Sequence, residues 1–380
     1  MMIWKTFRYR LEPTGEQRQL FARFAGSCRF VFNHALAARI TAYEQEGKTL
    51  SFAEQCKTLT GMKKAEGTVW LSEVHSQVLQ QALKDLDAAY EHFFRRVKKG
   101  ETPGFPRFKK KGVKDSFRYP QGIKVQGGKV YLPKIGWVRY RDSRPVEGKI
   151  LQATIKRDGD HWFVCLACEI ELREPVKPPI NEERALGIDV GLKTFASLSD
   201  GAEIPNPHFL RGALQRLRRA QRSLSRRVKG SANWFKQKAK VAKLHRKVRD
   251  SRLDFLHQLS TRLVKSHDVI AVEGLNIRGM VKNRHLARAI SDVGWGMFLA
   301  MLRYKAEWLG KHFVQIGRFE ATSKKCSACG EKKPMPLSVR TYSCGNCGLV
   351  MDRDFNASLN IRAAGLSALH ACGGVACAPL

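Results

Sequence analysis

Long apolar runs are missing from this sequence of 380 residues. No stretch reaches the roughly 18 consecutive apolar residues that a membrane-spanning helix requires, so we expect no transmembrane segment and no membrane partner. The opening residues, MMIWKTFRYRLEPTGEQ, also lack the uninterrupted apolar core of a secretory signal. These two absences lead us to expect a cytoplasmic protein.

Acidic residues are scarce as well. Only 34 Asp and Glu stand against 68 Lys and Arg, which gives a net charge of +34. Such a charge repels itself and needs a polyanionic partner, and nucleic acid is the usual one because cationic side chains release the counterions condensed on phosphate. The alternative is a basic solvated surface, as on some ribosomal proteins. With 43% apolar residues, the chain has enough for the packed cores of two or three domains.

Cysteine is the residue type whose spacing carries most information. Cys326 and Cys329, then Cys344 and Cys347, form two Cys-x-x-Cys-Gly knuckles with 14 residues between them. Zn²⁺ takes four tetrahedral thiolates at about 2.3 Å, and each knuckle presents two thiolates to one side. We predict a closed zinc site that supports folding and performs no catalysis. A redox disulfide pair is the alternative.

The other cysteines do not suggest a metal site. Cys165 and Cys168 also spell Cys-x-x-Cys, but they lie inside HWFVCLACEI, which reads as one strand. Residues three apart on a strand point to opposite faces about 10 Å apart, so these two cannot share an ion. Cys372 and Cys377 have no partners at a metal-binding spacing.

The first half of the chain combines strands with long helices. Residues 2–11 read as a strand, and Thr14 with Gln17 forms a capping box at the start of a helix. A second helix is predicted from about Ser72 to Val97. Short alternating segments follow up to about residue 173 and indicate a small antiparallel sheet or barrel, with which the first strand can pair.

The second half alternates strands and helices after the Pro-rich linker REPVKPPINEE, which indicates an α/β domain. ALGIDVG and KTFASLSDG read as a strand hairpin, residues 208–267 as a long helical region, and DVIAVEGLNI as a strand. A helix over Ser291–Lys311, the strand FVQIGRF and a short terminal helix, DFNASLNIRAAGL, complete the domain. We expect a mobile tail from Ala368 onward.

Three acids occupy unusual positions. Asp189 and Glu273 each lie within an apolar strand pattern, and Asp354 follows the second cysteine knuckle at the mouth of a helix. A carboxylate in an apolar strand is costly unless it is paired or bound to metal. Each acid has a simpler explanation, a salt bridge for the strand acids or an N-cap for Asp354. Together they supply the oxygen-rich set that Mg²⁺ or Mn²⁺ prefers in two-ion phosphodiester hydrolysis.

Several motifs then point to one family. They are SQVLQQAL (76–83), PRFKKK (106–111), GIDVGLK (187–193), VEGLN (272–276), the two knuckles and DRDFNASLNI (352–361). In this order they resemble the RuvC-type nuclease of the TnpB/OrfB proteins, which insertion sequences encode and which are often labelled transposases. The resemblance covers nearly the whole chain.

The resemblance implies an α/β plus β-barrel fold. A wedge-type barrel would span residues 1–12 and 100–175 and carry a helical recognition insertion over 13–99. An RNase H-like (RuvC) nuclease domain would span 182–320 and 351–367, with a zinc-ribbon insert at 321–350 and a flexible tail at 368–380.

The resemblance also implies a chemistry and its partners. Carried over by motif, Asp189, Glu273 and Asp354 are the catalytic acids and the ligands of Mg²⁺ (or Mn²⁺), with Asp189 bridging two ions. The implied partners are a guide RNA derived from the element end and a double-stranded DNA target beside a short element-adjacent motif. Miniature type V CRISPR nucleases are relatives. We expect a monomer or weak dimer associated with the nucleoid.

Two basic stretches are candidate nucleic-acid contacts. Between Arg211 and Arg249 there are 15 Lys or Arg residues and no acid, with apolar points at helical spacing. We predict a helical hairpin that binds phosphates without reading sequence. A solvated charged face is the alternative here, as it is for the run from Arg107 to Lys114. The candidate contact residues are Arg107, Lys109, Lys110, Lys111, Arg218, Arg219, Arg226 and Arg227.

Three functions are weighed on this basis. The main hypothesis is an RNA-guided DNA endonuclease. A nuclease-derived, RNA-guided DNA-binding repressor is disfavoured because all three acids are present. A transposase acting in strand transfer is disfavoured because the resemblance assigns that step to a separate enzyme.

Overall fold

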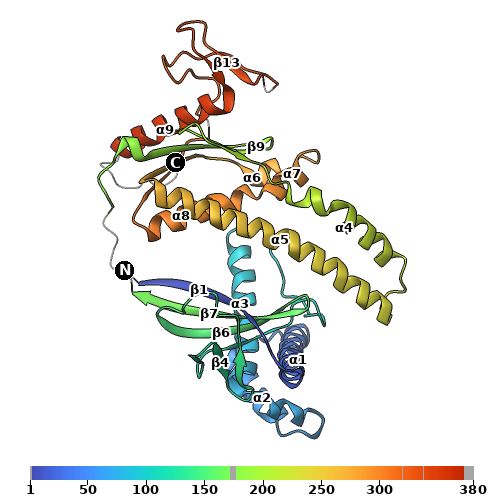
Figure 1. Ribbon diagram of the computed structural model, residues 1–380. Helices are drawn as coiled ribbons and strands as arrows, with labels where there is room; N and C mark the ends of the chain where they lie inside the picture. The colour runs from blue at the N-terminus through green and yellow to red at the C-terminus, as the bar shows by residue number, and fades with distance from the viewer. Residues whose placement is uncertain (1, 172–176, 319, 337, 372–380) are drawn as a thin grey trace. The chain divides into compact units, whose positions relative to one another are not determined.

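The computed structural model describes residues 2–171, 177–318, 320–336 and 338–371 (Figure 1). The chain divides into two compact units, Met1–Arg173 and Glu174–Leu380. The division falls at the start of the Pro-rich segment that the sequence marks as a linker. Within the described ranges, no helix combines the length and apolar character needed to cross a membrane.

Three helices dominate the first unit. They are α1 (Gly15–Glu46), α2 (Phe52–Met62) and α3 (Ser76–Lys98), with a 3₁₀ helix over Glu66–Glu73. The Thr14–Gln17 capping box is confirmed, because each side chain bonds the other residue's backbone N–H. Sequence reasoning missed α2, although its own capping box, Ser51 with Glu54, is present. The predicted start of α3 at Ser72 was wrong because the 3₁₀ turn occupies that segment.

The strands of the first unit form two antiparallel sheets. The larger has the order β1-β7-β6-β2, from β1 (Met2–Leu11), β7 (His161–Glu171), β6 (Lys149–Asp158) and β2 (Ser116–Tyr119). The smaller contains β3 (Lys124–Gln126), β4 (Lys129–Leu132) and β5 (Gly136–Arg139). The first strand does pair with the later ones, since β1 runs along β7 over its whole length. In the described part of the chain, one isolated bridge, Leu11–Tyr140, connects the sheets, and barrel closure stays a prediction.

Strand β7 shows whether Cys165 and Cys168 can share a metal ion. Its side chains alternate strictly between buried and half-buried positions. Cys168 is buried in the core, whereas Cys165 lies on the other face. The two thiols therefore point apart, as predicted.

A five-stranded sheet organises the second unit. Its order is β10-β9-β8-β11-β12, from β10 (Glu203–Pro205), β9 (Thr194–Leu198), β8 (Ala185–Val190), β11 (Val269–Glu273) and β12 (His312–Ile316). Strands β8, β11 and β12 are parallel. Strands β9 and β10 extend the sheet as antiparallel hairpins, which confirms the predicted hairpin after β8.

Helices cover both faces of this sheet. They are α4 (Phe209–Ser225), α5 (Ala232–Ser266), α6 (Ile277–Met280), α7 (Ala287–Val293), α8 (Trp295–Trp308) and α9 (Arg353–Ala371), with a 3₁₀ turn at Glu182–Arg184. Side chains of α5, α7 and α8 share a core with Ile270 and Val272 on one face. Helix α9 packs on the opposite face against Val269 and Ala271.

Two helix boundaries differ from the sequence-based prediction. The single helix expected over Ser291–Lys311 is two helices, α7 and α8, joined at Gly294 with φ +73°. A positive φ suits glycine and interrupts the helix. Helix α9 also continues beyond the predicted start of the tail, and Leu369 is buried in the core. The remaining tail, residues 372–380 with Cys372 and Cys377, lies outside the described residues.

Candidate functional site

Strand register brings Asp189 and Glu273 to one edge and one face of the sheet. In the parallel pair β8–β11, Val272 lies opposite Ile188, so the next residues along, Glu273 and Asp189, are neighbours. Adjacent strands are about 4.8 Å apart, and side chains alternate between faces with a period of two. Ala185 and Val269 face α9, and therefore Asp189 and Glu273, four residues further on, face α9 too.

Gly187 allows α9 to lie against β8. A Cβ atom at this position would clash with the backbone oxygen of Ser358 and would lie 2.6 Å from the backbone nitrogen of Arg362. Only glycine permits this approach of the two backbones. The close contact holds the first turn of α9, with Asp354, beside the strand that carries Asp189.

Asp352 provides the helix cap that sequence reasoning considered for Asp354. Its Oδ1 accepts the backbone N–H groups of Asp354 at 2.8 Å and Phe355 at 3.1 Å. These are donors that a helix start leaves without partners. The carboxylate of Asp354 is thus not needed for capping.

Asp189 is influenced electrostatically by the other two acids. The pKa of Asp189 is raised to about 8, mainly by burial and then by the charges of Asp354 and Glu273, against an opposing effect of Arg353. Burial also raises the pKa of Glu273. Crowded, desolvated carboxylates disfavour ionisation unless a cation neutralises them. The donor set of three carboxylates therefore fits a hard divalent ion such as Mg²⁺ or Mn²⁺.

The acids are close without forming a tight cage. Among the described residues, the four cysteines of the ribbon have ligand atoms that all lie within 4.8 Å of one another. The three acids do not meet this distance. Asp354 instead lies 3.5 Å from the guanidinium of Arg340, a half-exposed residue just before β13 (Thr341–Ser343). Sequence reasoning missed Arg340, because a single arginine in a chain this basic carries no distinguishing signal.

The cysteine quartet is assembled as predicted. Cys326 and Cys347 have their sulfur atoms 3.6 Å apart, and those of Cys329 and Cys344 are 3.5 Å apart. Four thiolates at about 2.3 Å from a tetrahedral ion would be about 3.8 Å apart, so the arrangement fits zinc. The cysteines are free thiols rather than disulfides.

Local backbone geometry explains why glycine follows each knuckle. Gly330 and Gly348 have φ of +79° and +75°, and their N–H groups donate to the carbonyls of Cys326 and Cys344. Backbone N–H groups within each turn point at the first sulfur. They lower the pKa of Cys326 and lower that of Cys344 to about 6. The first thiolate of each knuckle is thus stabilised in the protonation state that zinc requires, whereas the pKa of Cys347 is raised to about 12.

The ribbon is fastened to the helix that carries Asp354. Asn356 donates to the carbonyl of Lys325 at 2.8 Å and accepts from the N–H of Ser327 at 3.0 Å. Asn360 donates to the same Lys325 carbonyl at 2.7 Å. Arg353, largely buried, donates to the carbonyl of Pro336 at 2.9 Å. Sequence analysis included these anchoring residues in the DRDFNASLNI motif but assigned them no role. Their spacing as polar residues on one helix face could have indicated that this face is anchored.

The predicted basic hairpin is present. Helices α4 and α5 pack against each other and are joined by residues 226–231. The candidate contacts Arg218, Arg219, Arg226 and Arg227 are all exposed. Their role as nucleic-acid contacts stays a prediction.

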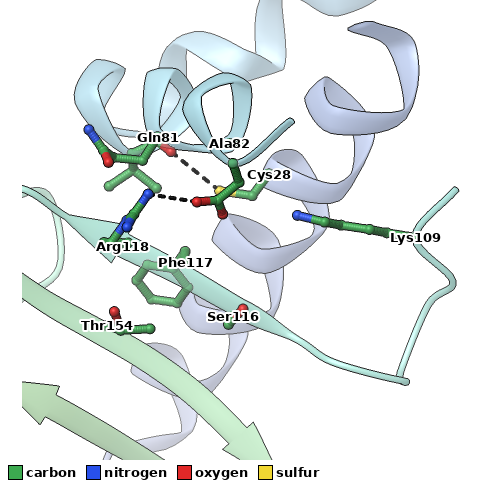
Figure 2. A pocket seen from close by; sticks show the side chains of 10 residues that line it. Cys28, Gln81, Ala82, Lys109, Ser116, Phe117, Arg118 and Thr154 are labelled. Atoms are coloured by element: carbon green, nitrogen blue, oxygen red, sulfur yellow. Dashed lines mark hydrogen bonds and ion pairs between the residues drawn. The ribbon is translucent and has the colours of Figure 1, made fainter. Parts of the chain in front are cut away.

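Lys109 differs from the other candidates of the first basic run. It points into a cavity of about 240 Å³ whose lining includes Cys28, Gln81 and Arg118 (Figure 2). Its ammonium lies 3.8 Å from the centre of the Phe32 ring, and burial lowers its pKa. Lys109 is nevertheless exposed, as are Arg107, Lys110 and Lys111.

The sheet order, the helices on both faces and the acids at the strand ends define a RuvC-like nuclease fold with a cysteine ribbon. A solved structure supports this class: the "Cryo-EM structure of the Cas12f1-sgRNA-target DNA complex" superposes with a TM-score of 0.57 at 12% identity, covering 95% of this chain and 99% of that one. At this identity the likeness concerns the fold alone.

Sequence comparison identifies the family. Residues 166–284 match the OrfB_IS605 model, described as "Probable transposase", residues 295–361 the "Cas12f1-like, TNB domain" and residues 1–48 the OrfB_IS605 "Helix-turn-helix domain". "Putative RNA-guided DNA endonuclease InsQ" of Escherichia coli (strain K12) is 38% identical, covering 97% of this chain and 94% of its own length. "Putative RNA-guided DNA endonuclease" of Streptomyces pristinaespiralis is 40% identical, covering 98% and 91%. The chain belongs to this TnpB/OrfB family of insertion-sequence proteins, which confirms the resemblance.

Proposed function

We propose that this protein is an RNA-guided DNA endonuclease of an insertion sequence, hydrolysing phosphodiester bonds at Asp189, Glu273 and Asp354. The observation that carries the proposal is the convergence of these acids, from two adjacent parallel strands and the first turn of α9, at one edge of the sheet. The near full-length relatives named as RNA-guided DNA endonucleases support the substrate and the guide.

The acids are proposed as the ligands of Mg²⁺ or Mn²⁺. When bound, such ions activate a water and stabilise the charge that develops on the leaving oxygen. Asp189 would hold such ions together with the other two acids, since burial and the charges of Asp354 and Glu273 raise its pKa. Glu273 and Asp354 would complete the donor set.

Other residues of the site orient these acids. Asp352 fixes the first turn of α9, and Gly187 sets its distance from β8. Arg340, 3.5 Å from Asp354, carries a positive charge suited to a phosphate oxygen entering the site. The zinc ribbon, with Zn²⁺ held by the four cysteines, is proposed to support Arg340 and the start of α9 and to take no chemical part.

The proposed partners are a guide RNA from the element end and a double-stranded DNA target. Base pairing between guide and target supplies sequence selection, while basic surfaces hold the backbones. A wedge-type barrel in residues 1–12 and 100–175 and a recognition role for residues 13–99 are part of the proposal. A nucleoid-associated cytoplasmic location and a monomeric or weakly dimeric state complete it.

Substitution of Asp189 tests the proposal. Asp189→Asn preserves the shape of the side chain, so the purified complex with its RNA should bind target DNA as before but lose cleavage in Mg²⁺. Asp250→Asn, at an exposed acid on α5, is the matched control and should cleave normally. Undiminished cleavage by Asp189→Asn would remove this residue from the mechanism. Joined rather than cut products would favour strand transfer, and binding without cleavage by the unaltered protein would favour a repressor.

A further inference from the structure

Aromatic rings lie among cations where α4 passes into α5. This hairpin tip, residues 226–238, contains Trp234 and Phe235 with ring centroids 5.1 Å apart in an edge-to-face arrangement. Phe235 is 57% exposed, and Val228 in the connecting turn is 78% exposed. Rings set in a positively charged surface are the feature on which proteins stack unpaired nucleobases.

Local contacts fix the start of α5 and surround the Trp234 ring. Ser231 caps α5 by accepting the N–H of Trp234 at 3.1 Å, and Gln237 ties α5 to α4 by donating to the carbonyl of Ala220 at 2.9 Å. The ammonium of Lys238 lies 4.9 Å from the centre of the Trp234 ring. Trp234 therefore already has a cation over its ring and is partly buried, which leaves Phe235 as the ring presented to a partner.

The base of the hairpin is held firmly to the nuclease unit. Asp292 on α7 accepts the backbone N–H of Leu210 at 3.0 Å and pairs with Arg252 on α5 at 2.7 Å. Both charged side chains are mostly buried. The length of α5 between Arg252 and Trp234 is about 27 Å. Figure 1 shows α4 and α5 extending together away from the sheet. The tip is thus carried at a fixed distance from the unit's core.

Charge indicates the kind of partner. The tip and both adjoining helix segments lack acids from Arg211 to Arg249, and Arg226, Arg227 and Lys236 are exposed. Cations bind phosphates, but an aromatic ring needs the face of a base, which a duplex buries in its own stack. Folded RNA offers unpaired bases in loops and at ends, and proteins recognise them on aromatic side chains.

We propose that Phe235 stacks on an unpaired base of the guide RNA while the surrounding cations bind the phosphates that flank this base. The inference rests on the proposed function for the presence of a guide RNA, but it does not depend on DNA cleavage. It gives the hairpin a contact with a base in addition to its phosphate contacts.

Binding of a defined probe by the full-length protein in Mg²⁺-free buffer tests this. The probe is a single-stranded oligouridine RNA containing one 2-aminopurine, whose fluorescence falls on stacking. Phe235→Ala should weaken binding about tenfold, as for the loss of one stacked base, and abolish the quenching. Phe235→Trp should retain both. Phe235→Leu, which keeps an apolar side chain without a ring, should behave like Phe235→Ala.

Controls separate stacking from other effects. Val228→Ala removes an exposed apolar side chain of the same tip and should bind normally. Arg227→Gln should weaken binding and reduce its salt dependence, whereas Phe235→Ala should leave the salt dependence unchanged. Three results would each overturn the proposal. The first is that Phe235→Ala binds the RNA with unaltered affinity, and the second is that Phe235→Leu binds it as well as the wild type does. The third is that Phe235→Ala loses affinity for oligothymidine DNA but not for RNA.

The catalytic proposal and the stacking proposal can be refuted independently of each other. If Asp189→Asn still cleaves, the proposed catalytic role fails, while the binding difference between Phe235→Ala and Phe235→Trp remains measurable. If both Phe235 variants bind the RNA probe equally, the stacking proposal fails whether or not DNA is cut.

Discussion

Adding one methyl group at Gly187 tests how the site is assembled. The Cβ of Gly187→Ala would lie 2.6 Å from the backbone nitrogen of Arg362 and closer still to the oxygen of Ser358. Ordinary contacts need about 3.5 Å or more, so α9 must retreat from β8 by about 1 Å. Backbone atoms cannot rotate away as a flexible side chain can.

This retreat has two expected costs. Overpacking should destabilise the second unit by about 1–3 kcal/mol. Because Asp354 lies in the first turn of the displaced helix, its distance from Asp189 also changes, and a misplacement of about 1 Å can cost a factor of about 100 in rate. We therefore expect the catalytic loss to exceed what the loss of folded protein explains.

The assay is single-turnover DNA cleavage in Mg²⁺ by the purified complex, beside thermal unfolding and zinc content. Gly212→Ala is the matched control: it lies on α4 with no atom within 4 Å of the added Cβ, and Ala favours a helix, so it should cleave normally and be slightly more stable. Wild-type stability and cleavage in Gly187→Ala would refute the claim that close packing of α9 on β8 positions the acids.

Three further outcomes are expected. The Asp352→Ala variant should be about 1 kcal/mol less stable and should cleave more slowly, because the cap of α9 is lost. The Asp352→Asn variant keeps the accepting oxygen and should have wild-type stability and cleavage. Slow cleavage by Asp352→Asn would indicate instead that Asp352 is a metal ligand. Cys344→Ser should lose zinc, measured by elemental mass spectrometry, and lower the unfolding midpoint; retained zinc would contradict the closed four-thiolate site. Lys305 is buried, its ammonium donates to neutral acceptors including Ser260 and Thr261, and burial lowers its pKa to about 8. The unfolded chain therefore binds the proton of Lys305 more tightly than the folded chain does. The stability of the wild type relative to Lys305→Met should increase as pH rises from about 8 towards 10.5. Thermal unfolding of both proteins across this range measures the difference, and a difference that does not change with pH would contradict the prediction.

Local patterns carried much of the prediction. The capping box at Thr14, the strand segments of the first unit and the basic hairpin follow from spacing of a few residues, and the structure confirms them. The interruption at Gly294 was missed because glycine inside an apolar periodic segment does not by itself distinguish a helix break from a tolerated residue.

The site was harder to predict because its geometry is not local. The sequence marks Asp189, Glu273 and Asp354 as unusual acids, but only register and the packing of α9 show that two of them face the third. The ambiguity between Asp352 and Asp354 was resolved by backbone hydrogen bonds. Arg340 became visible as a neighbour of Asp354 only once the ribbon was folded.

The sequence alone determined the excess of cations, the paired cysteine knuckles and the order of motifs, because each depends on residue type and short-range spacing. The tertiary structure decided which carboxylate caps a helix, which arginine lies beside an acid and how closely α9 approaches β8, because these depend on residues far apart in the chain meeting at one sheet edge.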